Sequence, residues 1–95
     1  MTTVVKVDRR KPNYTVYIGR AWAGLSESKW ANPFHISNGR DREEVIALYE
    51  RHVRTEPRLM KAIPELVDQV LGCWCHPLPC HGDVLVKLVE EYLAH

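Results

Sequence analysis

All three cysteines of the chain lie between positions 73 and 80, beside two of its five histidines. The surrounding segment runs from Gly72 to Asp83 and reads GCWCHPLPCHGD. Thiols and imidazoles are among the side chains whose ligand strength and nucleophilicity proteins tune most readily. An apolar stretch precedes this segment and a helical pattern follows it. We therefore expect a functional site where a strand ends and a helix begins.

The residue types of this segment suit a zinc ion, which binds thiolates and imidazoles in tetrahedral geometry. The ligands would be Cys73, Cys75 and Cys80 together with His81. The spacing fits less well, because structural zinc sites usually leave roughly two to four residues between paired cysteines and one gap here is a single residue. Neighbouring ligands would also strain to reach one ion, so the fourth could instead be His76 or His35. Alternatively, the cysteines are small buried side chains at a tight corner.

A third use of this segment is nucleophilic or redox chemistry at Cys80. The residue stands at the start of the last predicted helix, where unpaired backbone amides lower the pKa of a thiol. His81 would act as its base, and Asp83 as an orienting carboxylate or a helix cap. An enzyme of this kind would act on a nucleotide or nucleoside.

A second group of candidate residues lies in the segment SKWANPF, at positions 28–34. It combines a cation, a hydroxyl, an amide and two large aromatic rings, a mixture suited to an anionic, planar ligand. Lys29 and Arg20 would bind phosphate or carboxylate, and Asn32 would read hydrogen-bonding edges. The aromatic rings would stack on a base, or would anchor the loop in a small core beneath it. The expected ligand-binding residues are Arg20, Ser28, Lys29, Trp30 and Asn32.

Hydrophobic periodicity predicts the elements that must position these two segments. Strands are expected near 3–7, 14–19 and 70–75, and helices near 41–54, 57–67 and 82–94. Asp41 and Glu44 are spaced as a capping box for the first helix. Pro57 suits the first turn of the second helix, and Pro64 is expected to divide it. The segment 21–39 fits neither period and is predicted to be a long loop.

The order of these elements predicts a small α/β sandwich with a short mixed or parallel sheet. The first two strands could form a hairpin. The strands near 14–19 and 70–75 should pair in parallel across a right-handed crossover. Because the carboxyl ends of parallel strands meet at one edge of the sheet, the loops that follow these two strands would border one crevice.

Length and composition indicate one compact domain over residues 1–95. The chain is 45% hydrophobic and 26% charged, which gives a core large enough to fold alone. Its sequence contains neither a signal-peptide pattern nor the roughly 20 consecutive apolar residues of a membrane span. We therefore expect a cytoplasmic protein with no membrane partner.

The charge pattern gives no global drive toward nucleic acid, since the formal net charge is only +1. Nucleic-acid binding stays open because the N-terminal part contains a basic cluster of Lys6, Arg9, Arg10 and Lys11. Four further arginines are interleaved with acids and indicate a solvated helix face: Arg40, Arg42, Arg51 and Arg54.

Three motifs, taken in order, resemble a family of small domains of unknown function that is widespread in bacteriophages and bacteria. They are VYIGR, SKWANPF and CWCHPLPCHGD, which match a family signature of IGR, SKWxNPF and CWCxPxxCHxD. The resemblance runs from about Val4 to about Leu93 and implies a phage or bacterial protein, but it supplies no established reaction. The chain departs from the family at Ala31 and Asp68, where members often have glycine. The signature positions are Arg20, Lys29, Asn32, Cys73, Cys75, Cys80, His81 and Asp83.

Our leading hypothesis is that the chain binds a nucleotide-like or phosphorylated ligand, or a nucleic-acid end. The ligand would lie in a crevice between the SKWANPF loop and the CWCHPLPCHGD turn. A second hypothesis is a zinc-stabilised interaction module that engages a host protein. The third is the enzyme that uses Cys80, His81 and Asp83.

Overall fold

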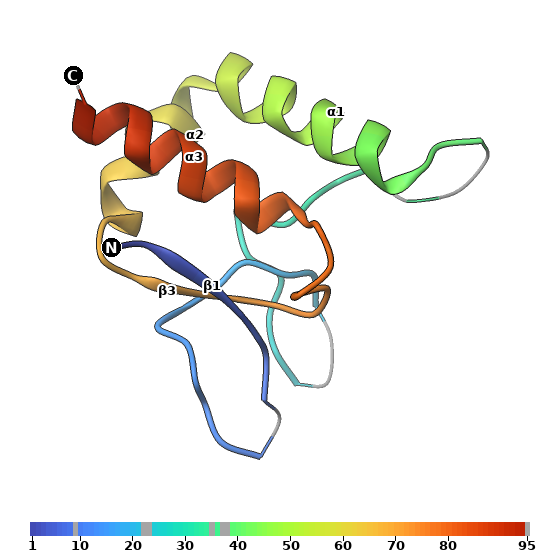
Figure 1. The fold of residues 1–95 in the computed structure, drawn as a ribbon, viewed down its shortest axis with the longest axis vertical. Coiled ribbons are helices and arrows are strands. Elements are labelled where there is room, and N and C mark those ends of the chain that lie inside the picture. Colours follow the sequence, from blue (N-terminus) through green and yellow to red (C-terminus); the bar gives the residue numbers. More distant parts are fainter. Residues whose placement is uncertain (9, 22–23, 35, 37–38, 95) are drawn as a thin grey trace.

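The computed structural model describes residues 1–8, 10–21, 24–34, 36 and 39–94. The chain forms a small α/β fold with a three-stranded sheet and helices packed on it (Figure 1). The elements in chain order are β1 (Thr3–Lys6), β2 (Val16–Tyr17), α1 (Arg42–Thr55), α2 (Pro57–Ala62), a 3-10 helix η1 (Ile63–Leu66), β3 (Val70–Cys73) and α3 (His81–Ala94).

The sheet has the order β1-β3-β2, and both outer strands run parallel to β3. Thr3 pairs with Val70 on one side of β3, and Val16 pairs with Leu71 on the other. The parallel pairing predicted for the second and third strands is thus confirmed. The hairpin expected between the first two strands is wrong, because the apolar β3 takes the central position between them, where both of its edges are paired.

The helices lie on one face of this sheet (Figure 1). Leu71 and Cys73 of β3 belong to the buried core, together with Leu85 and Leu88 of α3. Residues of β3 alternate between the two faces, and the opposite face is covered by the rings of three half-buried residues, Tyr14, Tyr17 and Trp74. A Cβ added to Gly72 would lie 2.7 Å from Cγ of Tyr14, so only glycine lets that ring pack flat against the central strand.

Local signals set the helix limits. The Asp41 carboxylate accepts a hydrogen bond from the backbone N–H of Glu44 at 2.8 Å, which caps α1. Pro57 occupies the first turn of α2, and Pro64 lies in η1, so the predicted second helix is divided as expected. At the end of α3, Tyr92 and Leu93 are exposed.

The strands are shorter than the sequence predicts. The strand β2 covers two residues only, although Thr15 and Ile18 on either side also hydrogen-bond to β3, and β3 ends at Cys73, so Cys75 lies in the turn that follows. The link into β3 contains Asp68 with φ of 60°, the left-handed region that favours glycine. This is one of the two positions at which the resembled family often has glycine.

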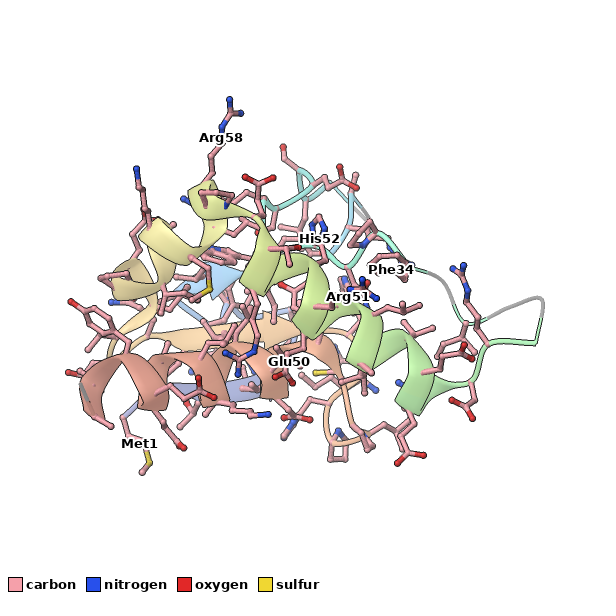
Figure 2. The ribbon with its side chains drawn as sticks, turned by 90° about the horizontal axis from the view of Figure 1, so that it is seen from above. Met1, Phe34, Glu50, Arg51, His52 and Arg58 are labelled. Carbon is pink, nitrogen blue, oxygen red and sulfur yellow. The ribbon has the colours of Figure 1, made fainter. Side chains whose placement is uncertain are left out.

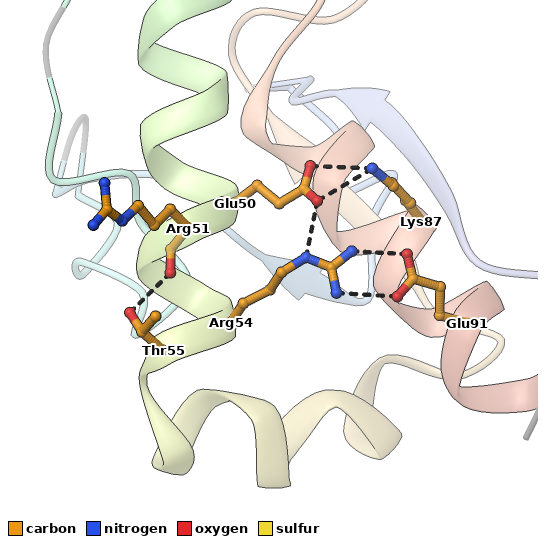
Figure 3. A network of polar contacts seen from close by, with 6 residues as sticks. All are labelled: Glu50, Arg51, Arg54, Thr55, Lys87 and Glu91. Atoms are coloured by element: carbon orange, nitrogen blue, oxygen red, sulfur yellow. Dashed lines mark hydrogen bonds and ion pairs between the residues drawn. The ribbon is translucent and has the colours of Figure 1, made fainter.

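An ion network joins α1 to α3 on the surface (Figure 3). The Arg54 guanidinium donates to Glu50 at 2.8 Å and, through both Nη atoms, to the Glu91 carboxylate. Lys87 of α3 completes the network by donating to Glu50 at 3.1 Å. Solvent-exposed pairs contribute little individually, so the network mainly fixes the register of the two helices. Across the described part of the chain, no helix has the length and apolar character that a membrane span requires.

Candidate functional site

A pocket of about 660 Å³ opens at the edge of the sheet where β2 and β3 end. Four segments form its wall: the residues after β2, the loop before α1, the first turns of α1, and the turn from β3 into α3. The lining residues are Gly19, Arg20, Ala21, Asn32, Phe34, Ile36, Arg42, Val45, Ile46, Cys73, Trp74, Cys75, Pro79, Cys80 and His81. The parallel strands therefore bring the two candidate segments to one site, for the topological reason given above.

Arg20 holds the long loop against the end of β2. Its Nε donates to the carbonyl oxygen of Asn32 at 3.0 Å, and its Nη2 donates to that of Phe34 at 2.8 Å. The Asn32 side chain in turn accepts from the backbone N–H of Phe34 at 2.9 Å, which closes a tight turn. Arg20 and Asn32 both line the pocket as predicted. Some of the hydrogen-bonding groups of each side chain are already bonded to the backbone of the loop.

Trp30 anchors the same loop from below. Only 2% of the residue is exposed, and it belongs to the hydrophobic core. Its carbonyl oxygen accepts a hydrogen bond from the buried Tyr49 hydroxyl of α1 at 2.7 Å. Of the two interpretations that the sequence left open for this ring, the structure places it as a core anchor and not as a platform for a base.

Lys29 and Ser28 do not line the pocket. The Lys29 ammonium is exposed, forms an ion pair with Glu65 at 2.8 Å and lies 5.5 Å from the centre of the Trp30 ring. The Ser28 hydroxyl accepts from the backbone N–H of Trp30 at 3.0 Å. Both residues thus lie outside this pocket, because Trp30 is buried and the adjacent Lys29 is turned outward; their predicted contact with a ligand stays a prediction.

Phe34 supplies the aromatic surface that the sequence assigned equally to Trp30. Its ring stands edge-to-face against His52 of α1, with ring centres 6.1 Å apart (Figure 2). The Arg40 guanidinium lies 5.9 Å from the centre of the same ring. These contacts fix the ring at the wall of the pocket, beside the apolar side chains Ile36 and Ile46.

The charge on the pocket wall is positive. Arg20 and Arg42 line it, whereas no aspartate or glutamate does among the residues that the structure describes. One Nη of Arg42 donates to the carbonyl oxygen of Pro79 at 3.0 Å, and this contact holds the side chain over the turn. The sequence placed Arg42 on a solvated helix face. The position of Arg42 in the pocket wall was missed, because a capping pattern locates the start of a helix but does not identify the segment against which that start packs.

Cys80 directly precedes α3, which begins at His81. The backbone N–H of Cys80 donates to the Asp83 carboxylate at 3.1 Å, so Asp83 serves as the helix cap that the sequence offered as one of its two roles. The Cys73 thiol and the backbone amides of Gly82 and Asp83 lie near the Cys80 sulfur, and the Asp83 N–H donates to the Cys80 carbonyl oxygen at 3.0 Å. The Cys73 thiol and these amides lower the pKa of Cys80 below the usual value of a thiol, despite its burial.

Cys73 is the last residue of β3. Its contact with Cys80, together with burial, raises the pKa of the Cys73 thiol well above its ordinary value. Its sulfur also accepts from the backbone N–H of Cys75 at 3.5 Å. All three cysteines are free thiols. The two buried ones form a contacting pair in which the pKa of Cys80 is lowered and that of Cys73 is raised.

His81 is buried beside this pair. Its Nε2 lies 2.7 Å from the carbonyl oxygen of Ile18, and its ring packs edge-to-face on Tyr49 at 4.9 Å between centres. A carbonyl can only accept, so Nε2 carries the proton. Burial lowers the pKa of His81, and the neutral ring thus ties the end of β2 to the start of α3. His81 Nε2 is thus committed to Ile18 and the Asp83 carboxylate to the Cys80 amide, and the catalytic roles predicted for these two residues stay predictions.

Acid should therefore destabilise the fold through His81. Its pKa is lowered in the folded state, so the unfolded chain binds the proton more tightly and stability is lost as the pH falls below about 6.5. We expect His81→Gln, whose amide can still donate to Ile18, to lose less free energy of unfolding than the wild type between pH 7 and 5, by about 1 kcal/mol. Denaturant titrations at the two pH values measure this.

The matched control is His76→Gln, which changes a half-buried histidine in the turn. This variant should keep the acid sensitivity of the wild type. Parallel pH profiles for the wild type and His81→Gln would contradict the assignment of a buried neutral ring.

The geometry gives the zinc expectation no support. Within the described ranges, no group of three or more His, Cys, Asp or Glu side chains is arranged to hold a metal ion. Cys73, Cys75, Cys80 and His81 all fall within these ranges. Two of the thiols are in contact with each other, and the His81 ring is committed to a carbonyl oxygen. His35, the alternative ligand from the loop, lies outside the described residues.

Comparison with known proteins identifies relatives without an assigned activity. A family model described as Domain of unknown function (DUF4326) matches residues 4–91. An uncharacterized protein of Acanthamoeba polyphaga mimivirus is 37% identical over 109 residues, a match that covers 94% of this chain and 82% of the viral protein. No solved structure matches the chain.

Proposed function

Because the chain belongs to a family whose description, Domain of unknown function (DUF4326), names no reaction, we propose its function from the pocket: it binds a nucleotide-like or phosphorylated ligand, or a nucleic-acid end. The observation that carries this proposal is the composition of the wall. Two arginines face a space of about 660 Å³ in which no described carboxylate takes part. Volumes of several hundred Å³ are typical of small-molecule sites.

The two halves of such a ligand find different surroundings in the pocket. The guanidinium groups of Arg20 and Arg42 offer fixed, planar donors, which suit phosphate oxygens better than a flexible ammonium does. Arg20 already donates to two backbone carbonyls and Arg42 to one, so the remaining donors of each guanidinium are held in place. The apolar part of the ligand would pack on Phe34 and the aliphatic side chains of α1.

A thermal-shift panel tests the proposal. The compounds are nucleoside monophosphates, the matching nucleosides, ribose 5-phosphate, inorganic phosphate and a short 5′-phosphorylated oligonucleotide. We expect a nucleoside monophosphate or the oligonucleotide end to stabilise the protein more than either half alone, because only these occupy both surfaces. A ligand at about 100 times its Kd adds roughly 2.7 kcal/mol to the free energy of unfolding. A panel without any stabilising compound would refute the proposal.

Arg42→Ala should weaken that binding about ten-fold or more, since a hydrogen bond to a charged group is worth roughly 1.5–3 kcal/mol. Isothermal titration of the compound selected by the panel measures the change. The control is Arg58→Ala, because Arg58 on α2 is exposed and projects away from the molecule (Figure 2). Equal affinities for the two variants would show that the cationic wall does not bind the ligand.

A further inference from the structure

We propose that Cys73 and Cys80 form a dithiol site that exchanges with low-molecular-weight disulfides and closes to a Cys73–Cys80 disulfide in the wall of the pocket. The pair was not evident from the sequence, in which a strand end and a helix start are separated by six residues. This activity goes beyond ligand binding and does not depend on it. It rests on the contact between the two thiols, on their placement and on their access to the pocket.

The first support is the geometry of the pair. Cys73 ends β3 and Cys80 directly precedes α3, and the turn between them folds back so that the two side chains contact each other. Their residues are 2% and 3% exposed, and both belong to the hydrophobic core. A disulfide needs its two sulfur atoms side by side on a backbone that permits contact. The fold already provides this contact with the thiols free.

The second support is the difference between the two thiols. Cys80 lies at the start of a helix, with the Cys73 thiol and the amides of Gly82 and Asp83 near its sulfur. Such an environment favours the thiolate, which is the attacking species in exchange. Cys73 lies beside Cys80, and this contact together with burial raises the pKa of the Cys73 thiol, which makes it the poorer attacking group. The roles of attacking and resolving thiol are thereby divided between the two residues.

The exchange proceeds in two balanced steps. The Cys80 thiolate attacks one sulfur atom of the small disulfide RS–SR, the S–S bond breaks, and RS⁻ leaves and takes up a proton. Cys73 then loses its proton and attacks the Cys80 sulfur, which expels the second RS⁻, again protonated by solvent. Overall, the two cysteines lose two electrons and two protons, and the small disulfide is reduced to two thiols.

The small disulfide would reach the thiols through the pocket, because both Cys73 and Cys80 line it. Oxidised glutathione is a suitable probe, because its carboxylates match the arginines of the wall and its size is compatible with about 660 Å³. Cys75 lies in the turn of the same wall but is only half-buried, so it provides an internal comparison.

The experiment equilibrates the folded full-length chain in glutathione buffers of increasing oxidised fraction. Free thiols are then blocked with N-ethylmaleimide, the disulfides are reduced, and the released thiols are labelled with iodoacetamide. Trypsin yields one peptide from Ala62 to Lys87 that holds all three cysteines, and its fragmentation locates each label. We expect maleimide on Cys75 and carbamidomethyl groups on Cys73 and Cys80. A bridge that includes Cys75, or three free thiols throughout the redox range while the protein stays folded, would overturn the proposal.

Single variants separate the two roles. Cys73→Ser should accumulate one glutathione on Cys80, because the resolving thiol is absent. Cys80→Ser should incorporate glutathione at Cys73, at a rate at least about ten-fold lower than that of Cys80 in the Cys73→Ser variant. Cys75→Ser should form the bridge at the wild-type rate. Circular dichroism verifies folding, and Cys73→Ala replaces the serine variant if that variant unfolds. Faster incorporation of glutathione at Cys73 than at Cys80 would reverse the assigned roles.

The formation of the disulfide is measured without any nucleotide. A protein that forms no bridge would therefore leave the ligand proposal standing, and a protein that binds no ligand would leave the disulfide proposal standing.

Discussion

Replacing Trp30 by alanine is expected to lower the free energy of unfolding by about 3–5 kcal/mol, a large part of the roughly 5–15 kcal/mol that a small domain has. The ring is 2% exposed and packs in the core beneath the long loop. Its removal exposes the cavity walls and loses the transfer free energy of a large apolar side chain. Urea unfolding followed by circular dichroism measures the change as a lower midpoint.

Lys29→Ala provides the control for Trp30→Ala, because it alters the adjacent residue of the same loop. The ammonium is exposed and pairs with Glu65 at the surface, so its loss should change stability by no more than about 1 kcal/mol. A larger loss of stability for Lys29→Ala than for Trp30→Ala would contradict the role of Trp30 as the anchor of the loop. If Trp30→Ala kept full stability and lost only ligand-induced stabilisation, the ring would be a binding platform and not part of the core.

Tyr49→Ala is expected to cost about as much, roughly 3–5 kcal/mol, through a cavity at the meeting point of α1, the loop and α3. The residue is fully buried, its ring packs on His81, and its hydroxyl donates to the Trp30 carbonyl. Burial raises the pKa of the Tyr49 phenol above its ordinary value, which favours the protonated hydroxyl that donates this bond. The variant also leaves a buried carbonyl without its partner.

Tyr49→Phe isolates the contribution of that hydrogen bond. It keeps the ring and removes the hydroxyl, and we expect a loss of about 1–3 kcal/mol in urea unfolding. Tyr92→Phe makes the same chemical change at a residue that is 49% exposed, and its effect should stay within about 0.5 kcal/mol. Equal effects for Tyr49→Phe and Tyr92→Phe would mean that the buried bond adds nothing to stability.

The helices and the parallel pairing of β2 with β3 were predictable because both depend on local patterns. Apolar spacing and the Asp41 cap located α1, and the two prolines located the break after α2. The direction of β3 relative to β2 followed from the intervening helices, since a crossover of that length joins parallel strands. The position of β1 did not follow, because three short apolar strands carry no local signal of their order across a sheet.

The sequence by itself determined which two segments would meet, since the carboxyl ends of parallel strands share an edge. Only the tertiary structure decided which side chains face the pocket. A loop without period does not encode the direction of its residues, so Trp30 turned into the core while Arg42 came from a helix that looked solvated. The contact of Cys73 with Cys80 and that of His81 with Ile18 depend on how α3 packs against the sheet. Hydrophobic periodicity records that a residue is buried, but the identity of its neighbours is set by packing over long sequence separations.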